Sequence, residues 1–240
     1  MKQNIYNNSV FFENYRDLRV NDKGLNGVIE LPALRKLIVN IDDAIVLDLG
    51  CGFGHQIQYM LEHKAKKIIG VDISEKMINE AQSRIQSENV LFVCKAIEDY
   101  EIEKNMFDII LSSMTLHYVK DLDIIFNNMY CGLKPGGQFI FSIEHPVCTA
   151  LLKSWIDTKD GKVWPIAHYS QEGIRYQDWF VSGVQKYHRK TSSIINSLIK
   201  SGFTIKKVDE PEPTNDVIDK RPELVGHIER PSVLIIKAVK

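Results

Sequence analysis

The sequence predicts an α/β fold in which helices cover both faces of a doubly wound, mostly parallel sheet of seven strands. Three observations predict it. Short apolar runs alternate with amphipathic stretches of helical period between residues 44 and 145. A glycine-rich turn directly follows the first apolar run. The chain has 240 residues, 44% hydrophobic and 25% charged, which suits a single soluble domain over 1–240.

Each strand of the first part has a local signal. β-Branched and aromatic residues gather between polar turns, as in buried parallel strands. The helices between the strands begin at capping residues: Ser74 precedes one apolar stripe and Asp121 another, and Pro32 suits a first turn. The five strands are expected at 44–50, 66–74, 90–96, 107–113 and 138–145.

The alternation stops after residue 145. Residues 146–190 contain all three tryptophans, and we expect them to form an aromatic-rich insertion after strand five that lies over the carboxyl edge of the sheet as a substrate cap. A helix over 191–201, capped by Thr191, follows. Strands at 203–210 and 232–239 complete the sheet, and the polar, proline-bearing stretch 211–231 is expected to be a loop.

Composition and charge narrow the functional classes. Thirty Lys and Arg residues face 31 Asp and Glu residues, so no bulk basic surface favours nucleic acid. No apolar run approaches the roughly 20 residues that span a bilayer, and the N-terminus lacks the apolar segment of a signal peptide. The four cysteines share no CxxC spacing, which favours reduced thiols and no metal site. We expect a cytoplasmic monomer or homodimer that binds neither membrane nor nucleic acid.

The strongest chemical signal is the glycine turn, residues 48–54, with the sequence Asp-Leu-Gly-Cys-Gly-Phe-Gly. Glycines at alternate positions let the backbone approach a ligand closely and adopt conformations that a Cβ forbids. The helix that follows directs its free N–H groups to the same place. The turn therefore predicts a nucleotide-type ligand at the carboxyl ends of the strands.

Two acidic residues narrow the choice of nucleotide. The dinucleotide fingerprint GxGxxG fails here, because His55 stands at its sixth position. Asp48 would repel a pyrophosphate and suits a ligand with a positively charged end. Asp72 ends the second strand about twenty residues after the turn, where a carboxylate can accept ribose hydroxyls. An NAD-dependent oxidoreductase is disfavoured but stays an alternative.

Five ordered segments carry a resemblance to a known family. VLDLGCGFG, GVDISEKM, KAIEDY, FDIILSSMTLHYV and LKPGGQFIFSIEHP run in the order seen in class I S-adenosylmethionine-dependent methyltransferases. Over roughly residues 30–145 the chain resembles the type 11 group, and within it bacterial small-molecule enzymes. The resemblance implies a Rossmann-like fold with a reversed last strand, and S-adenosyl-L-methionine as cofactor with S-adenosyl-L-homocysteine as product.

The resemblance also implies binding roles. The glycines would line the methionine part of the cofactor with Asp48 near its ammonium, and Asp72 would hold the ribose. The family often has an acid at the position of Ile97, and here Glu98, Asp99 or a backbone carbonyl would replace it. The implied cofactor-binding residues are Tyr15, Asp48, Gly50, Cys51, Gly52, Gly54, Asp72, Ile73, Met77, Ala96, Ile97, Glu98, Ser112, Ser113 and His117.

The reaction implied by this cofactor is an in-line displacement on the methyl carbon, which proceeds largely through alignment. A neutral or protonated acceptor would need a base. The insertion and its borders supply candidates for a base or a positioning group. The catalytic candidates are Glu144, His145, Tyr169 and His188, and Glu172 and Arg189 are further possibilities for positioning.

Several alternatives stay open at this point. The histidines are either catalytic or hydrogen-bonded rim residues, and the tryptophans either contact substrate or form a satellite core. The N-terminal residues 1–30 are either a lid, with Tyr6, Tyr15, Arg16 and Arg19 over the cofactor, or a docking helix. The chain is expected to methylate a small molecule; a non-catalytic cofactor-binding module is the alternative from another class.

Overall fold

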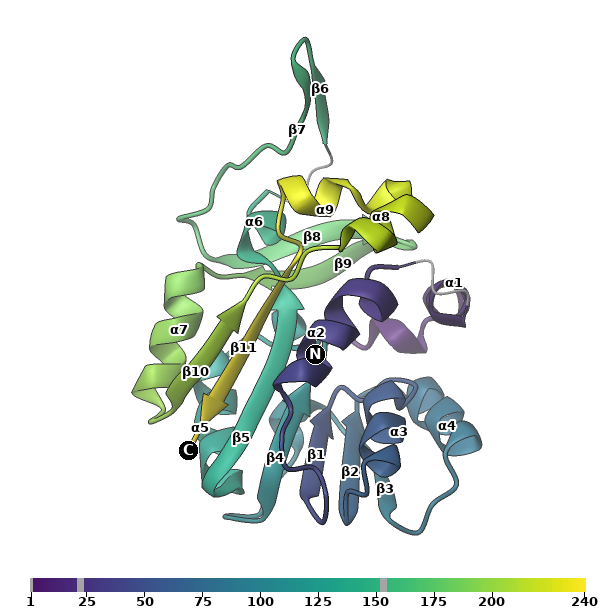
Figure 1. Cartoon of the computed structure of the whole chain (residues 1–240), viewed down its shortest axis with the longest axis vertical. Coiled ribbons are helices and arrows are strands. Elements are labelled where there is room, and N and C mark those ends of the chain that lie inside the picture. Colours follow the sequence, from purple (N-terminus) through teal and green to yellow (C-terminus); the bar gives the residue numbers. More distant parts are fainter. Residues whose placement is uncertain (1, 21–23, 152–154) are drawn as a thin grey trace.

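A central seven-stranded sheet organises the chain, whose computed structural model describes residues 2–20, 24–151 and 155–240 (Figure 1). The strand order is β10-β11-β5-β4-β1-β2-β3. Strand β11 runs antiparallel to both of its neighbours, and the remaining pairs are parallel. This confirms the predicted Rossmann-like sheet with a reversed last strand. The strands are β1 (Ile45–Leu49), β2 (Lys67–Asp72), β3 (Val90–Cys94), β4 (Phe107–Ser112), β5 (Leu133–Glu144), β10 (Thr204–Asp209) and β11 (Val233–Val239).

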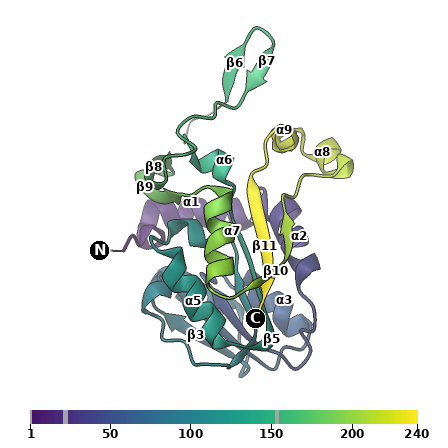
Figure 2. The same ribbon diagram turned by 90° about the vertical axis from the view of Figure 1, so that its left-hand side faces the viewer.

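Helices cover both faces of this sheet, because alternate strand residues point to opposite sides. Val46 and Ile109 face the helices α2 (Leu31–Leu37), α3 (His55–Glu62) and α4 (Glu75–Arg84). Leu47 and Ile110 face the helices α5 (Leu122–Gly132) and α7 (Thr191–Lys200), which lie in front of the sheet in Figure 2. The two clusters of buried side chains form the core.

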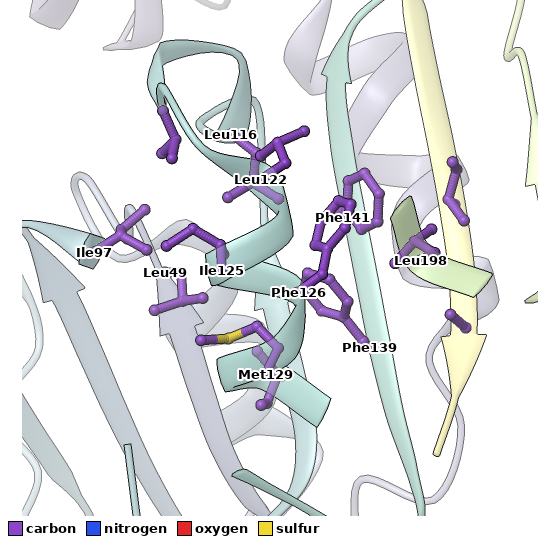
Figure 3. Close-up of a cluster of buried hydrophobic side chains, with 14 of the residues drawn as sticks. Leu49, Ile97, Leu116, Leu122, Ile125, Phe126, Met129, Phe139, Phe141 and Leu198 are labelled. Atoms are coloured by element: carbon purple, nitrogen blue, oxygen red, sulfur yellow. The ribbon is translucent and has the colours of Figure 1, made fainter. Parts of the chain in front are cut away.

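The cluster under α5 is rich in aromatic rings (Figure 3). Phe126 of α5 lies 5.5 Å from Phe141 and 5.8 Å from Phe139, both on β5, measured between ring centroids. Leu198 of α7 belongs to the same buried cluster. This packing fixes β5 and α5 and so the turn between β4 and α5 at the carboxyl edge of the sheet.

The insertion, called the cap from here on (residues 146–190), lies above the carboxyl ends of the parallel strands (Figure 1). Its described residues form the short helix α6 (Pro146–Thr149), the hairpin β6 (Ile156–Thr158)–β7 (Gly161–Val163) and the hairpin β8 (Gly173–Trp179)–β9 (Val181–His188). The first hairpin projects away from the body of the molecule.

The N-terminal segment packs against the second of these hairpins. It comprises the helical turn η1 (Ile5–Asn7), the helix α1 (Ser9–Val20) and the helical turn η2 (Asn26–Glu30). Phe11 of α1 is fully buried, with its ring 5.2 Å from Trp179 and 5.5 Å from Phe180. The helix predicted near the N-terminus is therefore present, and it contacts the cap.

Three local expectations were wrong. The side chain of Thr191 does not cap α7; the hydroxyl of Tyr169 accepts from the Thr191 N–H instead (3.1 Å). Residues 211–231 are not a plain loop, since they contain α8 (Asn215–Lys220), η5 (Pro222–Leu224) and α9 (Gly226–Glu229). Strand β5 begins at Leu133 rather than 138, because Leu133 already pairs with Phe107 across a bulge.

Candidate functional site

A cavity of about 950 Å³ opens at the carboxyl ends of β1, β2 and β4. This is where the strand order reverses from β1 to β4, the usual ligand position in an open α/β sheet. The turns after these strands, the start of the chain and the hairpin β8–β9 all contribute to its wall.

The glycine turn forms one side of this cavity. Gly50, Gly52 and Gly54 all have positive φ (72°, 51° and 80°), a region that favours glycine. A Cβ on Gly50 would lie 2.2 Å from Oγ1 of Thr115, whereas a Cβ on Gly52 would meet nothing within 4 Å. The turn therefore needs glycine at both positions, for a close approach at Gly50 and for backbone conformation at Gly52.

Asp72 connects the glycine turn to the start of α4. Its Oδ2 accepts from the Gly52 N–H (3.0 Å) and its Oδ1 from the Ser74 N–H (2.8 Å). Burial raises the pKa of Asp72 to about 6, although both hydrogen bonds act in the opposite direction. The carboxylate lines the cavity and keeps lone pairs for a ligand hydroxyl.

Asp48 is the most unusual group of the site. It is 2% exposed, and neither carboxylate oxygen has a hydrogen-bond partner among the described residues. Burial, with the charges of Asp72 and Glu30 behind it, raises the pKa of Asp48 to about 7. An unpaired buried carboxylate is costly, so this position calls for a positively charged ligand group.

Asp48 borders a chamber of about 40 Å³ that adjoins the main cavity through Tyr15, Gly50 and Gly52, which line both. The Gln56 Nε2 in the same chamber is also buried and without a partner in the described chain. Unpaired acceptors thus lie near an unpaired donor. This combination suits the ammonium and carboxylate of an α-amino acid.

The turn after β4 forms the opposite side of the cavity. Met114 lines it with a positive φ of 50°, and its N–H donates to Oγ of Ser142 (2.9 Å). Ser142 in turn donates to Oε1 of Glu30 (2.5 Å), which also accepts from Ser113 (2.9 Å). Glu30 is fully buried, and burial raises its pKa. The sequence analysis missed Glu30; its position within an apolar stretch is the signal that could have indicated it.

Comparisons with known proteins identify the family. A family model described as a methyltransferase domain matches residues 47–141. An uncharacterised protein of Haemophilus influenzae is 36% identical over 249 residues, covering 100% of this chain and 98% of that protein. A putative S-adenosylmethionine-dependent methyltransferase structure from Listeria monocytogenes is 41% identical with a TM-score of 0.83, covering 88% of this chain and 96% of that one. The structure of an S-adenosylmethionine-dependent methyltransferase from Mesorhizobium loti is 37% identical with a TM-score of 0.86, covering 90% of this chain and 100% of that one.

The chain belongs to the S-adenosylmethionine-dependent methyltransferase family. The resemblance found in the sequence is thereby confirmed. A reversed strand β11 also agrees with that resemblance.

The structure brings most of the predicted cofactor residues of this methyltransferase together. Asp48, Cys51 and Ser113 line the chamber beside the cavity. Three predicted residues of the described chain, Gly54, Ser112 and His117, line neither the main cavity nor the chamber. The Ser112 hydroxyl donates to the Leu49 carbonyl (2.9 Å) instead, and His117 Nδ1 accepts from the Glu144 N–H (3.2 Å). The predicted residues that line the main cavity are Tyr15, Gly50, Gly52, Asp72, Ile73, Met77, Ala96, Ile97 and Glu98.

The two histidines proposed as catalytic lie outside the cavity wall, and each is hydrogen-bonded. The Nε2–H of His145 donates to Glu210 Oε1 (2.7 Å). His188 donates through Nε2 to the Tyr169 carbonyl (2.9 Å) and accepts through Nδ1 from Thr149 (2.8 Å). Burial lowers the pKa of both imidazoles, which therefore stay neutral at pH 7.

The other two catalytic candidates also lie away from the cavity. Glu144 accepts from Nζ of Lys186 (2.6 Å), and the Tyr169 hydroxyl bonds the start of α7. The described structure thus does not gather the four candidates at one point, and their catalytic role stays a prediction.

Several cavity residues were not predicted from the sequence. Tyr118 follows β4 on the turn η4 (Leu116–Tyr118), and Gln185 and Tyr187 extend from β9. Tyr6 joins them from the N-terminal segment, as the lid interpretation expected of it. These side chains line the part of the cavity wall that the N-terminal segment, η4 and β9 form. Aromatic residues at the end of a strand and in the GVQKYHR segment were the available signal.

None of the three tryptophans, all of which lie in the described part of the cap, lines this cavity. Trp155 and Trp164 lie 5.6 Å apart edge to face, and the Arg230 guanidinium lies 4.0 Å from the Trp164 ring. Trp179 packs on Phe11. This favours the satellite-core interpretation. The ranges that the structure describes contain no helix able to cross a membrane and no cluster of side chains placed to hold a metal ion.

Proposed function

We propose that this chain transfers the methyl group of S-adenosyl-L-methionine to a small-molecule acceptor held against the tyrosine-lined wall of the cavity. The cofactor is that of the family to which the chain belongs. The observation that carries the proposal is the unpaired, buried Asp48 beside the glycine turn. When bound, the cofactor supplies an electrophilic methyl carbon on a positively charged sulfur.

The residues present fit this cofactor. Asp48 and Gln56 would bind the ammonium and the carboxylate of its amino-acid end, and Asp72 would bind its ribose. Ile73 and Ile97 line the cavity near Asp72 and offer apolar contacts for the adenine. Because the charged end meets a buried carboxylate, binding relieves the desolvation cost of Asp48.

The acceptor side of the cavity would orient the substrate and exclude water. Tyr6 and Tyr118 reach the cavity, and burial raises the pKa of both hydroxyls, so they remain protonated. Neutral phenols hydrogen-bond a polar acceptor and pack on its apolar part. The cavity volume falls within the range of sites for small molecules. Holding the acceptor in line with the methyl carbon accounts for most of the expected rate enhancement.

The two alternatives make different predictions. An NAD-dependent oxidoreductase would require a pyrophosphate beside Asp48, where its charge would be repelled. A non-catalytic binding module would hold the cofactor without transfer. Isothermal titration calorimetry with S-adenosylhomocysteine and with NADH distinguishes a methyltransferase from an oxidoreductase. Transfer of a labelled methyl group distinguishes a methyltransferase from a non-catalytic binding module.

The proposal is tested with methyl-labelled S-adenosylmethionine and two fractions of a bacterial cell extract. We expect label in a product from the low-molecular-weight filtrate and none in the retained protein and nucleic acid. Asp48→Asn should lose this activity, and Asp42→Asn, a change at an exposed residue, should keep it. Binding of NADH but not of S-adenosylhomocysteine would refute the proposal, and so would labelling of macromolecules alone.

A further inference from the structure

The first residues of the chain cross the cavity as a strap, defined here as residues 2–7. On the cofactor side, Nδ2 of Asn4 donates to the Ile73 carbonyl (2.9 Å). The hydroxyl of Ser74 donates to Oδ1 of Asn7 (2.7 Å), and Lys2 pairs with Asp99. The strap is thus fixed to the turns after β2 and β3, beside Asp72.

The other side of the strap is fixed to the cap. The side-chain amide of Gln3 pairs with the backbone of Gln185 in both directions. The Gln185 N–H donates to Oε1 of Gln3 (2.7 Å), and Nε2 of Gln3 donates to the Gln185 carbonyl (3.3 Å). The Tyr6 ring packs edge to face on Tyr118, with centroids 6.3 Å apart. The strap therefore joins the two sides of the cavity through six consecutive residues.

Asn4 has a vacant hydrogen-bonding atom at the centre of this strap. Its Oδ1 is buried and has no partner among the described residues, whereas its Nδ2 is already used. Asn4 lines the cavity, and its Nδ2 bonds the residue directly after Asp72. A buried amide oxygen without a donor is rare in native proteins, so a ligand hydroxyl or amine is the expected partner.

The proposed cofactor carries such donors on its ribose and adenine. We propose that Asn4 Oδ1 accepts a hydrogen bond from the nucleoside of the bound cofactor, and that this bond locks the strap and with it the acceptor-side wall. The inference rests on the proposed function, and it adds a binding residue that the sequence motifs do not contain.

Calorimetry on Asn4→Ala tests the hydrogen bond. Loss of one such bond to a neutral partner is expected to weaken S-adenosylhomocysteine binding by about 3- to 10-fold. 5′-Methylthioadenosine should lose a similar factor, because it keeps the nucleoside and lacks the amino-acid end. Asn14→Ala is the matched control: Asn14 is exposed on α1, and among the described residues its side chain bonds the Val10 carbonyl within the same helix.

A second measurement follows the strap directly. Hydrogen–deuterium exchange of the wild-type peptide that spans the strap should slow when S-adenosylhomocysteine is added, and this protection should be lost in Asn4→Ala. If wild-type chain binds S-adenosylhomocysteine but Asn4→Ala binds it as tightly as Asn14→Ala, or if exchange is unchanged by ligand, the inference fails and the proposed function stands. If the wild-type chain does not bind S-adenosylhomocysteine, the proposed function itself fails.

Discussion

At the scale of single residues, the site is defined by hydrogen-bonding groups that the protein leaves without partners. Asp48, Gln56 and Asn4 each hold a buried polar atom unpaired in the described chain. Such groups cost stability, and folded proteins keep them mainly where a ligand or water satisfies them. All three lie on the main cavity or on the chamber beside it. These three residues are therefore available to a ligand that occupies the cavity and the chamber.

Asp48 should make cofactor binding depend on pH. Its pKa is about 7 without ligand, and only the ionised form attracts the ligand ammonium. Between pH 7.5 and pH 6 the ionised fraction falls, so the affinity for S-adenosylhomocysteine should drop roughly tenfold. Calorimetry at the two values measures this. In Asp48→Asn the affinity should be low and should change by about twofold at most, through Asp72, whose pKa is about 6. A wild-type profile as flat as that of the variant would show that Asp48 does not face the charged end.

The same carboxylate should destabilise the free protein at high pH. An unfolded Asp ionises near pH 4, whereas Asp48 in the fold resists ionisation until about pH 7. The raised pKa therefore favours folding at acidic pH, and this contribution is lost as the pH rises from about 4 to 7. This rise in pKa from about 4 to about 7 corresponds to roughly 4 kcal/mol, so Asp48→Asn should gain up to about 4 kcal/mol in free energy of unfolding at pH 8.

Urea unfolding measures this gain, and its pH dependence is the critical observation. The advantage of Asp48→Asn should shrink strongly as the pH falls to 4, where Asp48 is neutral in the fold and only about half ionised in the unfolded chain. Asp42→Asn, at an exposed carboxylate, should follow the wild type throughout. A variant less stable than the wild type at pH 8 would mean that the carboxylate has a favourable partner in the free protein.

At the scale of elements, α1 connects the cap to the cavity and to the chamber beside it. Its Phe11 is buried against Trp179 of β8, and its Tyr15 lines both the cavity and the chamber. The strap precedes the same helix. Phe11→Ala should therefore lower the free energy of unfolding by about 3 kcal/mol, as removal of a buried ring usually does.

The same variant should loosen the site. Hydrogen exchange in α1 should speed up, and S-adenosylhomocysteine binding should weaken because Tyr15 and Asn4 depend on the docked helix. Val10→Ala serves as control, since Val10 is the preceding residue and is 57% exposed. Phe11→Ala with wild-type stability and affinity would show that α1 is dispensable for the site.

The elements that sequence predicted well are those with local signals. The strands β1 to β4 are short apolar runs, and Ser74 and Asp121 cap their helices as expected, accepting from the N–H groups of Met77 and Ile124. Thr191 failed as a cap because Tyr169, 22 residues away, supplies the hydroxyl. Local sequence contains no information on such a distant partner.

The same limit separates the predicted from the missed site residues. The glycine turn and Asp72 lie at strand ends, where fold topology alone places them at the cavity. The position of His145 depends on Glu210, 65 residues away, and that of Gln185 on Gln3, 182 residues away. The site residues of the cap and of the strap could therefore not be predicted from the sequence, because contacts between distant parts of the folded chain place them at the cavity.

At the scale of the whole molecule, the sheet concentrates buried acids at one point. Asp48 is the last residue but one of β1, Asp72 ends β2, and Glu30 approaches from η2. The charges of Asp72 and Glu30 add to the cost of ionising Asp48. The fold pays this cost in the free state. A cationic ligand that binds only the folded chain should recover it, and its effect should therefore appear in the stability of the entire domain.

Ligand addition should accordingly raise the melting temperature. S-adenosylhomocysteine at 100 times its Kd adds about 2.7 kcal/mol by mass action. For a domain of this size each kcal/mol shifts Tm by roughly 2–4 °C, so a rise of about 5–10 °C is expected at pH 7.5. At pH 6 the same concentration should stabilise by about 1.4 kcal/mol less, because the affinity is roughly tenfold weaker. NADH should give no rise; an equal rise with NADH, or the same shift in Asp48→Asn, would show that the stabilisation does not come from charge recognition at this site.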